Sequence, residues 1–186
     1  MDAIRNLYLT TEGRLSRKQW WLGVLGLFCV GIVLSVIASM AGYGMIAGIP
    51  TIDPANPDPV AFSAATAEIM RRGAWVSLVL FLVVAYPSYC LSIKRRHDRD
   101  SAGRDVLIAM VLNVVVLLIQ AFGLGLTSVD AGNGITVPAP SPLMMVVSAC
   151  LGLFSLYLLV VLGFLRGTPG SNSYGPDPVL GAAATA

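Results

Sequence analysis

The chain has 186 residues, of which 56% are hydrophobic and only 12% are charged, and its net charge is +2 at pH 7. Its mean hydropathy of +0.77 is well above that of soluble domains, and one globule of this size cannot hide so much apolar surface from water. The composition therefore excludes an ordinary soluble domain, including a soluble nucleic-acid binder, and indicates a membrane protein.

Four apolar blocks without any Asp, Glu, Lys, Arg or His predict four membrane-spanning helices. The predicted spans are about 20–47, 74–93, 106–126 and 143–165. A helix of about 20 residues crosses the hydrocarbon layer of roughly 30 Å, so each block is long enough. The first block is too long for the apolar core of a signal peptide, which favours a retained helix. The expected fold is all-α: an integral membrane four-helix transmembrane bundle in a single membrane domain, with a short amphipathic N-terminal segment and a turn-rich C-terminal tail.

The positive charges predict the orientation of these helices. Ten of the twelve Lys and Arg residues fall on one side of the predicted spans. These ten are Arg5, Arg14, Arg17, Lys18, Lys94, Arg95, Arg96, Arg99, Arg104 and Arg166. Cytoplasmic segments carry this excess, so we expect 1–19, 94–105 and 166–186 in the cytoplasm and 48–73 and 127–142 in the periplasm.

The two expected periplasmic connections differ from each other. In the first, Asp58 is a suitable cap and Pro59 a suitable first residue for a short helix that precedes the second span. Arg71 and Arg72 would lie near the C-terminus of that helix, where its dipole favours cations. The second connection, TSVDAGNGITVPAPSP, has the composition of turns and little else.

Before the first span, the segment TTEGRLSRKQWW (Thr10–Trp21) has the pattern of a helix start at the membrane surface. Ser16 followed by Gln19 is a capping box, so we expect the helix to start at Ser16. Arg17 then lies in the first turn, and Trp20 lies at the level of the lipid headgroups.

The charges of the chain are concentrated between the second and third spans, in KRRHDRDSAGRD (Lys94–Asp105). Five basic and three acidic residues alternate there, together with the only histidine of the chain. This alternation favours internal ion pairs, so we expect a folded cytoplasmic cap built from this segment, Thr10–Trp21 and the tail segment LRGTPGSNSYGPDP (Leu165–Pro178). There are two alternatives for this segment: it binds an anion or a lipid headgroup, or it is a topology signal without a fixed structure. The candidate residues are Arg14, Arg17, Trp20, Arg95, Arg96, His97, Asp98, Arg99, Asn172, Tyr174 and Asp177.

Together the three segments resemble the domain of unknown function 805 family of small bacterial inner-membrane proteins. The matching positions are Gly13, Arg14, Arg17, Trp20 and Trp21, then Arg95, His97, Asp98 and Gly103, and finally Gly167, Thr168, Gly170, Asn172, Tyr174, Gly175 and Pro178. The chain departs from the family pattern at Arg104, where an aromatic residue is usual, and at Ala102, which displaces the usual serine to Ser101. The resemblance implies a bacterial inner (plasma) membrane location, but the family lends no established activity.

The remaining motifs do not support catalysis. His97 with Asp98 and Asp100 is a poor metal site, because neighbouring residues do not converge easily on one ion and five cations surround them. We therefore expect no enzyme activity, metal or cofactor. The expected function is an accessory or structural protein of the lipid bilayer whose cap binds anionic lipid headgroups or another membrane protein, with a homo-oligomer possible. The alternative is a passive channel or transporter-like oligomer.

Overall fold

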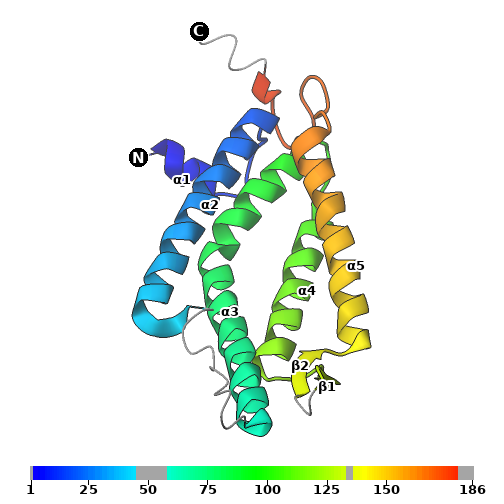
Figure 1. Cartoon of the computed structure of the whole chain (residues 1–186). Helices are drawn as coiled ribbons and strands as arrows, with labels where there is room; N and C mark the ends of the chain where they lie inside the picture. Colours follow the sequence, from blue (N-terminus) through cyan, green and yellow to red (C-terminus); the bar gives the residue numbers. More distant parts are fainter. Residues whose placement is uncertain (1, 45–57, 133–135, 180–186) are drawn as a thin grey trace. The chain divides into compact units, whose positions relative to one another are not determined.

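A computed structural model of the chain describes residues 2–44, 58–132 and 136–179, and these residues are mostly helical (Figure 1). In chain order the elements are α1 (Asp2–Leu9), α2 (Arg17–Ala38), the π-helical turn η1 (Ser39–Tyr43), α3 (Pro59–His97), α4 (Arg104–Ala121), β1 (Leu126–Asp130), β2 (Thr136–Pro140), α5 (Pro142–Leu159) and the π-helical turn η2 (Val160–Phe164).

Within the described residues, four helical segments are long and apolar enough to cross a membrane. They are Arg17–Tyr43, Pro59–His97, Arg104–Ala121 and Pro142–Phe164. Large apolar side chains such as Leu25 and Leu153 are exposed on these helices, which suits contact with lipid rather than water. The prediction of an all-α fold with four spans is confirmed, and it fits a multi-pass membrane protein.

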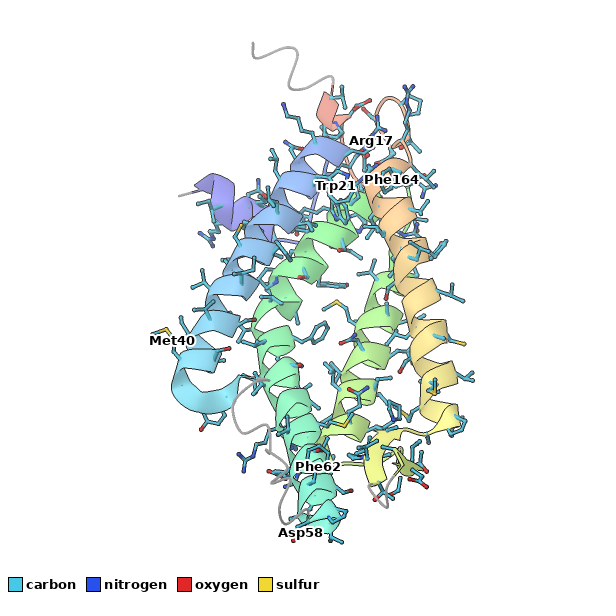
Figure 2. All side chains as sticks on the ribbon, in the orientation of Figure 1. Arg17, Trp21, Met40, Asp58, Phe62 and Phe164 are labelled. Carbon is cyan, nitrogen blue, oxygen red and sulfur yellow. The ribbon has the colours of Figure 1, made fainter. Side chains whose placement is uncertain are left out.

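The second of these segments, α3, is one continuous helix of 39 residues that starts after Asp58 (Figure 2). Asp58 caps it as predicted, because its Oδ1 accepts the backbone N–H groups of Val60 and Ala61 at 3.1 and 2.9 Å. The expected break between a short outer helix and the span does not occur. Several residues that follow Pro59 are alanines, which favour a helix. Glu68 then forms ion pairs with Arg71 and Arg72, which lie one turn after it on the same helix.

α3 is longer than a membrane span requires. The stretch between Arg72 and Lys94 contains 21 residues and no charge. It is about 31 Å long, which is close to the thickness of the hydrocarbon layer. The charged residues at both ends of α3 therefore lie outside the spanning stretch.

Two of the other predicted spans end earlier in the structure. α2 stops at Ala38 and continues as η1 to Tyr43, because Gly42 leaves the helical conformation with a φ of 83°. The predicted continuation to 47 lies outside the described residues. α4 ends at Ala121 rather than at 126, and Gly125 then turns the chain with a φ of 76°.

The connection between α4 and α5 is a β-hairpin, although its composition predicted turns alone. β1 and β2 pair in antiparallel register from Leu126↔Pro140 to Asp130↔Thr136. Both strands of a two-stranded sheet are edge strands, so the prolines of β2 are tolerated.

The contacts of the chain divide it into two compact units. The first consists of Met1–Ile32, Leu82–Val111 and Gly152–Ala186, and the second of Val33–Phe81 and Leu112–Leu151. The first unit has an apolar core of Leu15, Trp20, Leu91 and Leu162. Its parts of α2 and α3 lie beside the segment that follows α5 (Figure 1). This unit contains all three segments of the cap.

Candidate functional site

At the centre of the cap, the carboxylate of Asp98 is held between two arginines. Asp98 follows the last residue of α3, and its Oδ1 accepts hydrogen bonds from Arg14 Nε and Nη2 at 3.0 and 2.9 Å. Its Oδ2 accepts a hydrogen bond from Arg95 Nη1. The side chains of Arg14, Arg95 and Asp98 are 2%, 0% and 6% exposed. We call these three residues the triad, and it carries one positive charge in excess.

Backbone carbonyls surround that excess charge. Arg14 Nη1 donates to the carbonyl of Gly170 at 2.6 Å, and its Nη2 donates to that of Thr168 at 2.7 Å. Arg95 Nε donates to the carbonyl of Leu162 at 2.7 Å, and its Nη2 donates to that of Leu165. A buried guanidinium needs acceptors for its five N–H groups, and the end of α5 and the tail supply them. Burial lowers the pKa of Arg95, and the nearby Asp98 opposes this shift.

The start of α2 brings Arg14 to the triad. The predicted capping box is confirmed, because the Ser16 N–H donates to Gln19 Oε1 at 3.1 Å and the Gln19 N–H donates to Ser16 Oγ at 3.4 Å. Just before it, the Leu15 N–H donates to the carbonyl of Lys94 at 3.2 Å, and the Leu15 side chain is part of the core. These contacts fix the backbone directly after Arg14, so Arg14 has a defined position.

The tail segment folds back onto the end of α3. Thr168 donates its N–H and its hydroxyl to the carbonyl of Asp98 at 2.8 and 3.1 Å. Asn172 donates its side-chain amide to the carbonyl of His97 at 2.8 Å and exchanges backbone hydrogen bonds with Gly175. A Cβ at Gly167 would overlap the Asp98 carboxylate, so only glycine fits there. The described part of the tail is therefore an ordered series of turns, as the sequence indicated.

His97 joins the first and third segments of the cap. Its ring is stacked on that of Tyr174, with the centroids 3.9 Å apart and the planes 7° from parallel. Its Nδ1 lies 3.2 Å from the carbonyl oxygen of Gly13. Burial lowers the pKa of His97, and the hydrogen bond with Gly13 opposes the shift. The neutral ring is thus the form that the cap favours.

The other candidate residues lie around the triad in different roles. Asp177 accepts the N–H groups of Gly170 and Val179 at 3.1 and 2.9 Å. Arg96 forms its own ion pair with Asp105. Trp20 is buried in the apolar core, and its Nε1 has no hydrogen-bond partner among the residues the structure describes.

Two candidates lie at the edge of the site or outside it. Arg17 donates to the carbonyl of Phe164 at 3.2 Å and lines a pocket beside the triad. Arg99 is half-buried, and its backbone N–H donates to the carbonyl of Arg96. The structure therefore brings most of the candidate residues into one network but leaves the Arg99 side chain out of it.

Two residues that matter in this network were not among the candidates. Lys94 is only 3% exposed and donates to the carbonyls of Asn6 and Leu7, which joins α1 to the end of α3. Burial lowers the pKa of Lys94. Thr168 links the tail to Asp98, and its presence in the third family segment was the available signal. The sequence contains no comparable signal for the partners of Lys94, because they are backbone atoms.

A pocket of about 290 Å³ opens beside the triad. Its lining residues are Ser16, Arg17, Arg95, Asp98, Arg166, Gly167, Thr168, Pro169, Asp177 and Val179. In the described part of the chain, the Arg166 side chain has no hydrogen bond and no ion pair. The pocket and the triad together contain four arginines and two aspartates, so the site has a net charge of +2.

Two exposed aromatic rings lie next to Arg17. Trp21 and Phe164 meet edge to face with their centroids 5.8 Å apart, and Trp21 Nε1 donates to the carbonyl of Gly163 at 3.1 Å. Figure 2 shows Arg17, Trp21 and Phe164 together at one end of the first unit. Within the described ranges, no group of three His, Cys, Asp or Glu residues is arranged to hold a metal ion.

Comparison with known proteins gives one finding. A family model with the description "Protein of unknown function (DUF805)" matches residues 8–176, which include nearly all of the three cap segments. No curated protein and no solved structure gives a match.

The triad makes Asp98→Asn a severe substitution. It leaves two buried guanidiniums without a counter-charge, and we expect a loss of about 3–5 kcal/mol in the free energy of unfolding. Asp105→Asn is the matched control, because the Arg96–Asp105 pair is more exposed, at 12% and 18%, and only one arginine loses its counter-charge, so the loss should be clearly smaller. Thermal unfolding in detergent measures both. Equal losses in the two variants would contradict a central role for Asp98.

The stacked His97 predicts a pH-dependent stability. Its pKa in the folded chain is below the ordinary value of about 6.5, so the unfolded chain binds more protons between the two values. The melting temperature should therefore fall as the pH drops below about 6.5. His97→Phe keeps the ring stack but cannot take up a proton, and its melting temperature should fall less over the same window. Identical pH profiles would show that His97 does not carry the effect.

Proposed function

Because this chain belongs to the DUF805 family of proteins of unknown function, we propose its function from its own charges and contacts. We propose a non-catalytic accessory protein of the bacterial inner membrane, with both termini in the cytoplasm. In this proposal the cap binds the phosphate of an anionic lipid headgroup in the pocket beside the triad.

The charge of the pocket is the observation that carries this proposal. Asp98 is already matched by two arginines, so its negative charge does not repel an incoming anion. Arg166 is available to a ligand, and Arg17 donates one side-chain hydrogen bond, to the neutral carbonyl of Phe164. The hydroxyls of Ser16 and Thr168 add neutral hydrogen-bonding groups to the lining. Arginines with spare donors are well suited to phosphate oxygens.

The surroundings of the pocket favour a lipid over a soluble anion. Trp21 and Phe164 are exposed beside Arg17, and aromatic rings in membrane proteins gather at the level of the headgroups. A phosphate bound by Arg17 and Arg166 would then lie at the depth where lipid phosphates occur. An acidic protein partner would need the same charge but would gain less from exposed rings at the edge of the membrane.

The distribution of Lys and Arg supports the orientation. Ten of these twelve residues lie in the N-terminal segment, the connection between α3 and α4, and the tail. Segments this short follow the positive-inside rule, so the cap is proposed to face the cytoplasm and the hairpin the periplasm.

The headgroup assignment predicts selective stabilisation by anionic lipid. Short-chain phosphatidylglycerol should raise the melting temperature of the purified protein more than phosphatidylcholine does, since a ligand of the folded state stabilises it. Each arginine near a headgroup contributes about 1 kcal/mol, so the double variant Arg17→Gln, Arg166→Gln should bind phosphatidylglycerol about 30-fold more weakly. The variant Arg5→Gln, Arg104→Gln removes the same charge outside the pocket and should retain most of the effect.

Inorganic phosphate distinguishes the source of the anion. Stabilisation by phosphate equal to that by phosphatidylglycerol would indicate a soluble ligand and would contradict the lipid assignment.

The orientation predicts opposite outcomes for two reporters. Alkaline phosphatase fused after Gly132 should be active because it would be in the periplasm, whereas the same fusion after Ala186 should be inactive. Fluorescent protein fusions at the two positions should show the reverse pattern. Activity of one reporter at both positions would place the two segments in one compartment and overturn the proposed topology.

A further inference from the structure

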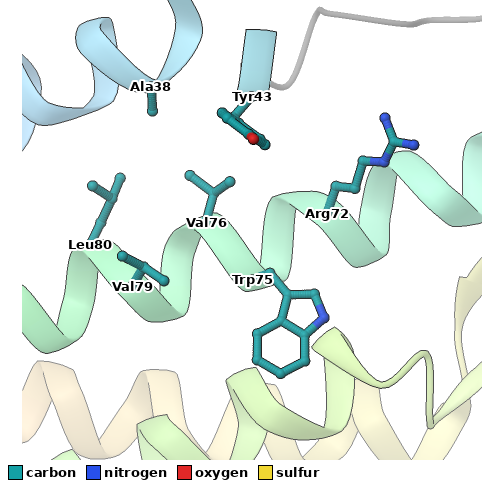
Figure 3. Close-up of a pocket in the computed structure, with 7 residues that line it drawn as sticks. All are labelled: Ala38, Tyr43, Arg72, Trp75, Val76, Val79 and Leu80. Carbon is teal, nitrogen blue, oxygen red and sulfur yellow. The ribbon is translucent and has the colours of Figure 1, made fainter. Parts of the chain in front are cut away.

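A second pocket lies in the other compact unit and has a different chemistry. Its volume is about 380 Å³, and it is lined by Ala38, Tyr43, Arg72, Trp75, Val76, Val79 and Leu80 (Figure 3). Six of these seven residues are apolar or aromatic. Val76 and Leu80 point from α3 toward Tyr43 and Ala38, and Arg72 extends on the same side of α3 (Figure 3). We infer that this pocket binds one acyl chain of an anionic phospholipid whose phosphate is bound by Arg72.

The end of the first span creates the pocket. The helix of α2 stops at Ala38, a small residue, and the positive φ of Gly42 redirects the chain before Tyr43. On the opposite wall, the Trp75 ring meets Phe122 edge to face at 5.3 Å, which limits its movement. The wall on the side of the first span is therefore set by the backbone turn at Gly42.

The position of the pocket along α3 matches the layers of a membrane. Arg72, Val76 and Leu80 are spaced by four residues, so they share one face of the helix. Arg72 is the last charged residue before the charge-free stretch, and Leu80 lies about 12 Å deeper along the helix axis. A lipid with its phosphate at Arg72 would therefore have its chain beside Val76 and Leu80.

The chemistry of the lining selects hydrocarbon as the occupant. Both walls belong to segments that are long and apolar enough to cross a membrane, so we expect lipid rather than water beside the pocket. Water in the apolar part would lack hydrogen-bond partners, whereas an acyl chain loses nothing by entering. The volume also falls within the usual range for small-molecule pockets, about 300–1,000 Å³.

The charge at the open end selects an anionic lipid. Glu68 Oε1 accepts a hydrogen bond from Arg72 Nε at 2.7 Å, and its Oε2 accepts one from Arg71 Nη2. The hydrogen bond from Arg72, and to a smaller extent that from Arg71, lowers the pKa of Glu68 below its ordinary value. At neutral pH one negative carboxylate therefore lies beside two positive arginines. Arg72 is 69% exposed, and within the described residues its two Nη atoms have no acceptor. They remain available to a phosphate.

The test is photocrosslinking from inside the pocket. A photoreactive amino acid replaces Val76 in the full chain, which is reconstituted in vesicles with equal amounts of phosphatidylglycerol and phosphatidylcholine. Mass spectrometry of the irradiated protein should show adducts of one phospholipid, with phosphatidylglycerol favoured about fivefold, the ratio expected for one arginine near a headgroup.

Two variants assign the selectivity to Arg72. Arg72→Gln should bring the ratio of the two lipids close to one. Arg71→Gln removes the same unit of charge but leaves Arg72, which lines the pocket, so the ratio should fall less than in Arg72→Gln. The double variant Arg17→Gln, Arg166→Gln is the control and should leave the ratio unchanged, so this result is independent of the lipid proposed for the cap.

Three outcomes would overturn the inference. A crosslink from position 76 to residues 45–57 would show that the chain itself fills the pocket. A crosslink to a second copy would make it an interface between subunits. An equal yield of both lipids in the otherwise unchanged chain would mean that the pocket only touches bulk lipid.

Discussion

The cap depends on one buried carboxylate that neutralises part of the charge of two guanidiniums. Arg14, Arg95 and Asp98 come from the segment before α2, the end of α3 and the residue after it, and their side chains are almost fully buried. Burying two cations with only one anion beside them would cost much free energy, because both cations lose their water. The carbonyls of the tail and of the end of α5 lower that cost, so the tail has to be ordered for the triad to exist.

This dependence explains why the charge-rich segment does not act as a simple basic patch. Asp98 and Asp105 are used inside the cap, and they hold Arg14, Arg95 and Arg96 in place. The positive charge that remains for a ligand lies instead at Arg17, in the first turn of α2, and at Arg166, in the tail segment. A segment whose own net charge is small can in this way help to build a site that attracts anions.

The sequence was sufficient for the spans and for the capping box, because apolar length and the Ser16–Gln19 spacing are local signals. It could not assign the partner of each charge. Lys94–Asp105 contains five cations and three anions, and the structure pairs Asp98 with the distant Arg14 while Arg96 pairs with Asp105. The carbonyl acceptors of Arg95 and Lys94 leave no trace in the side-chain pattern. The continuity of α3 was not predicted, because hydropathy marks where a helix leaves the membrane and not where the helix itself begins.

Near each end of α3, one carboxylate is paired with two arginines, but the two sets differ in their exposure to water. At one end Glu68 accepts from Arg71 and Arg72, and at the other Asp98 accepts from Arg14 and Arg95. The first set is 35–69% exposed, so water screens its ion pairs and they contribute little to stability. The second set is 0–6% exposed, and its geometry is fixed by carbonyls on every side. The excess charge near Glu68 is thus open to a ligand, whereas the excess charge of the triad is already surrounded and serves to hold the cap together.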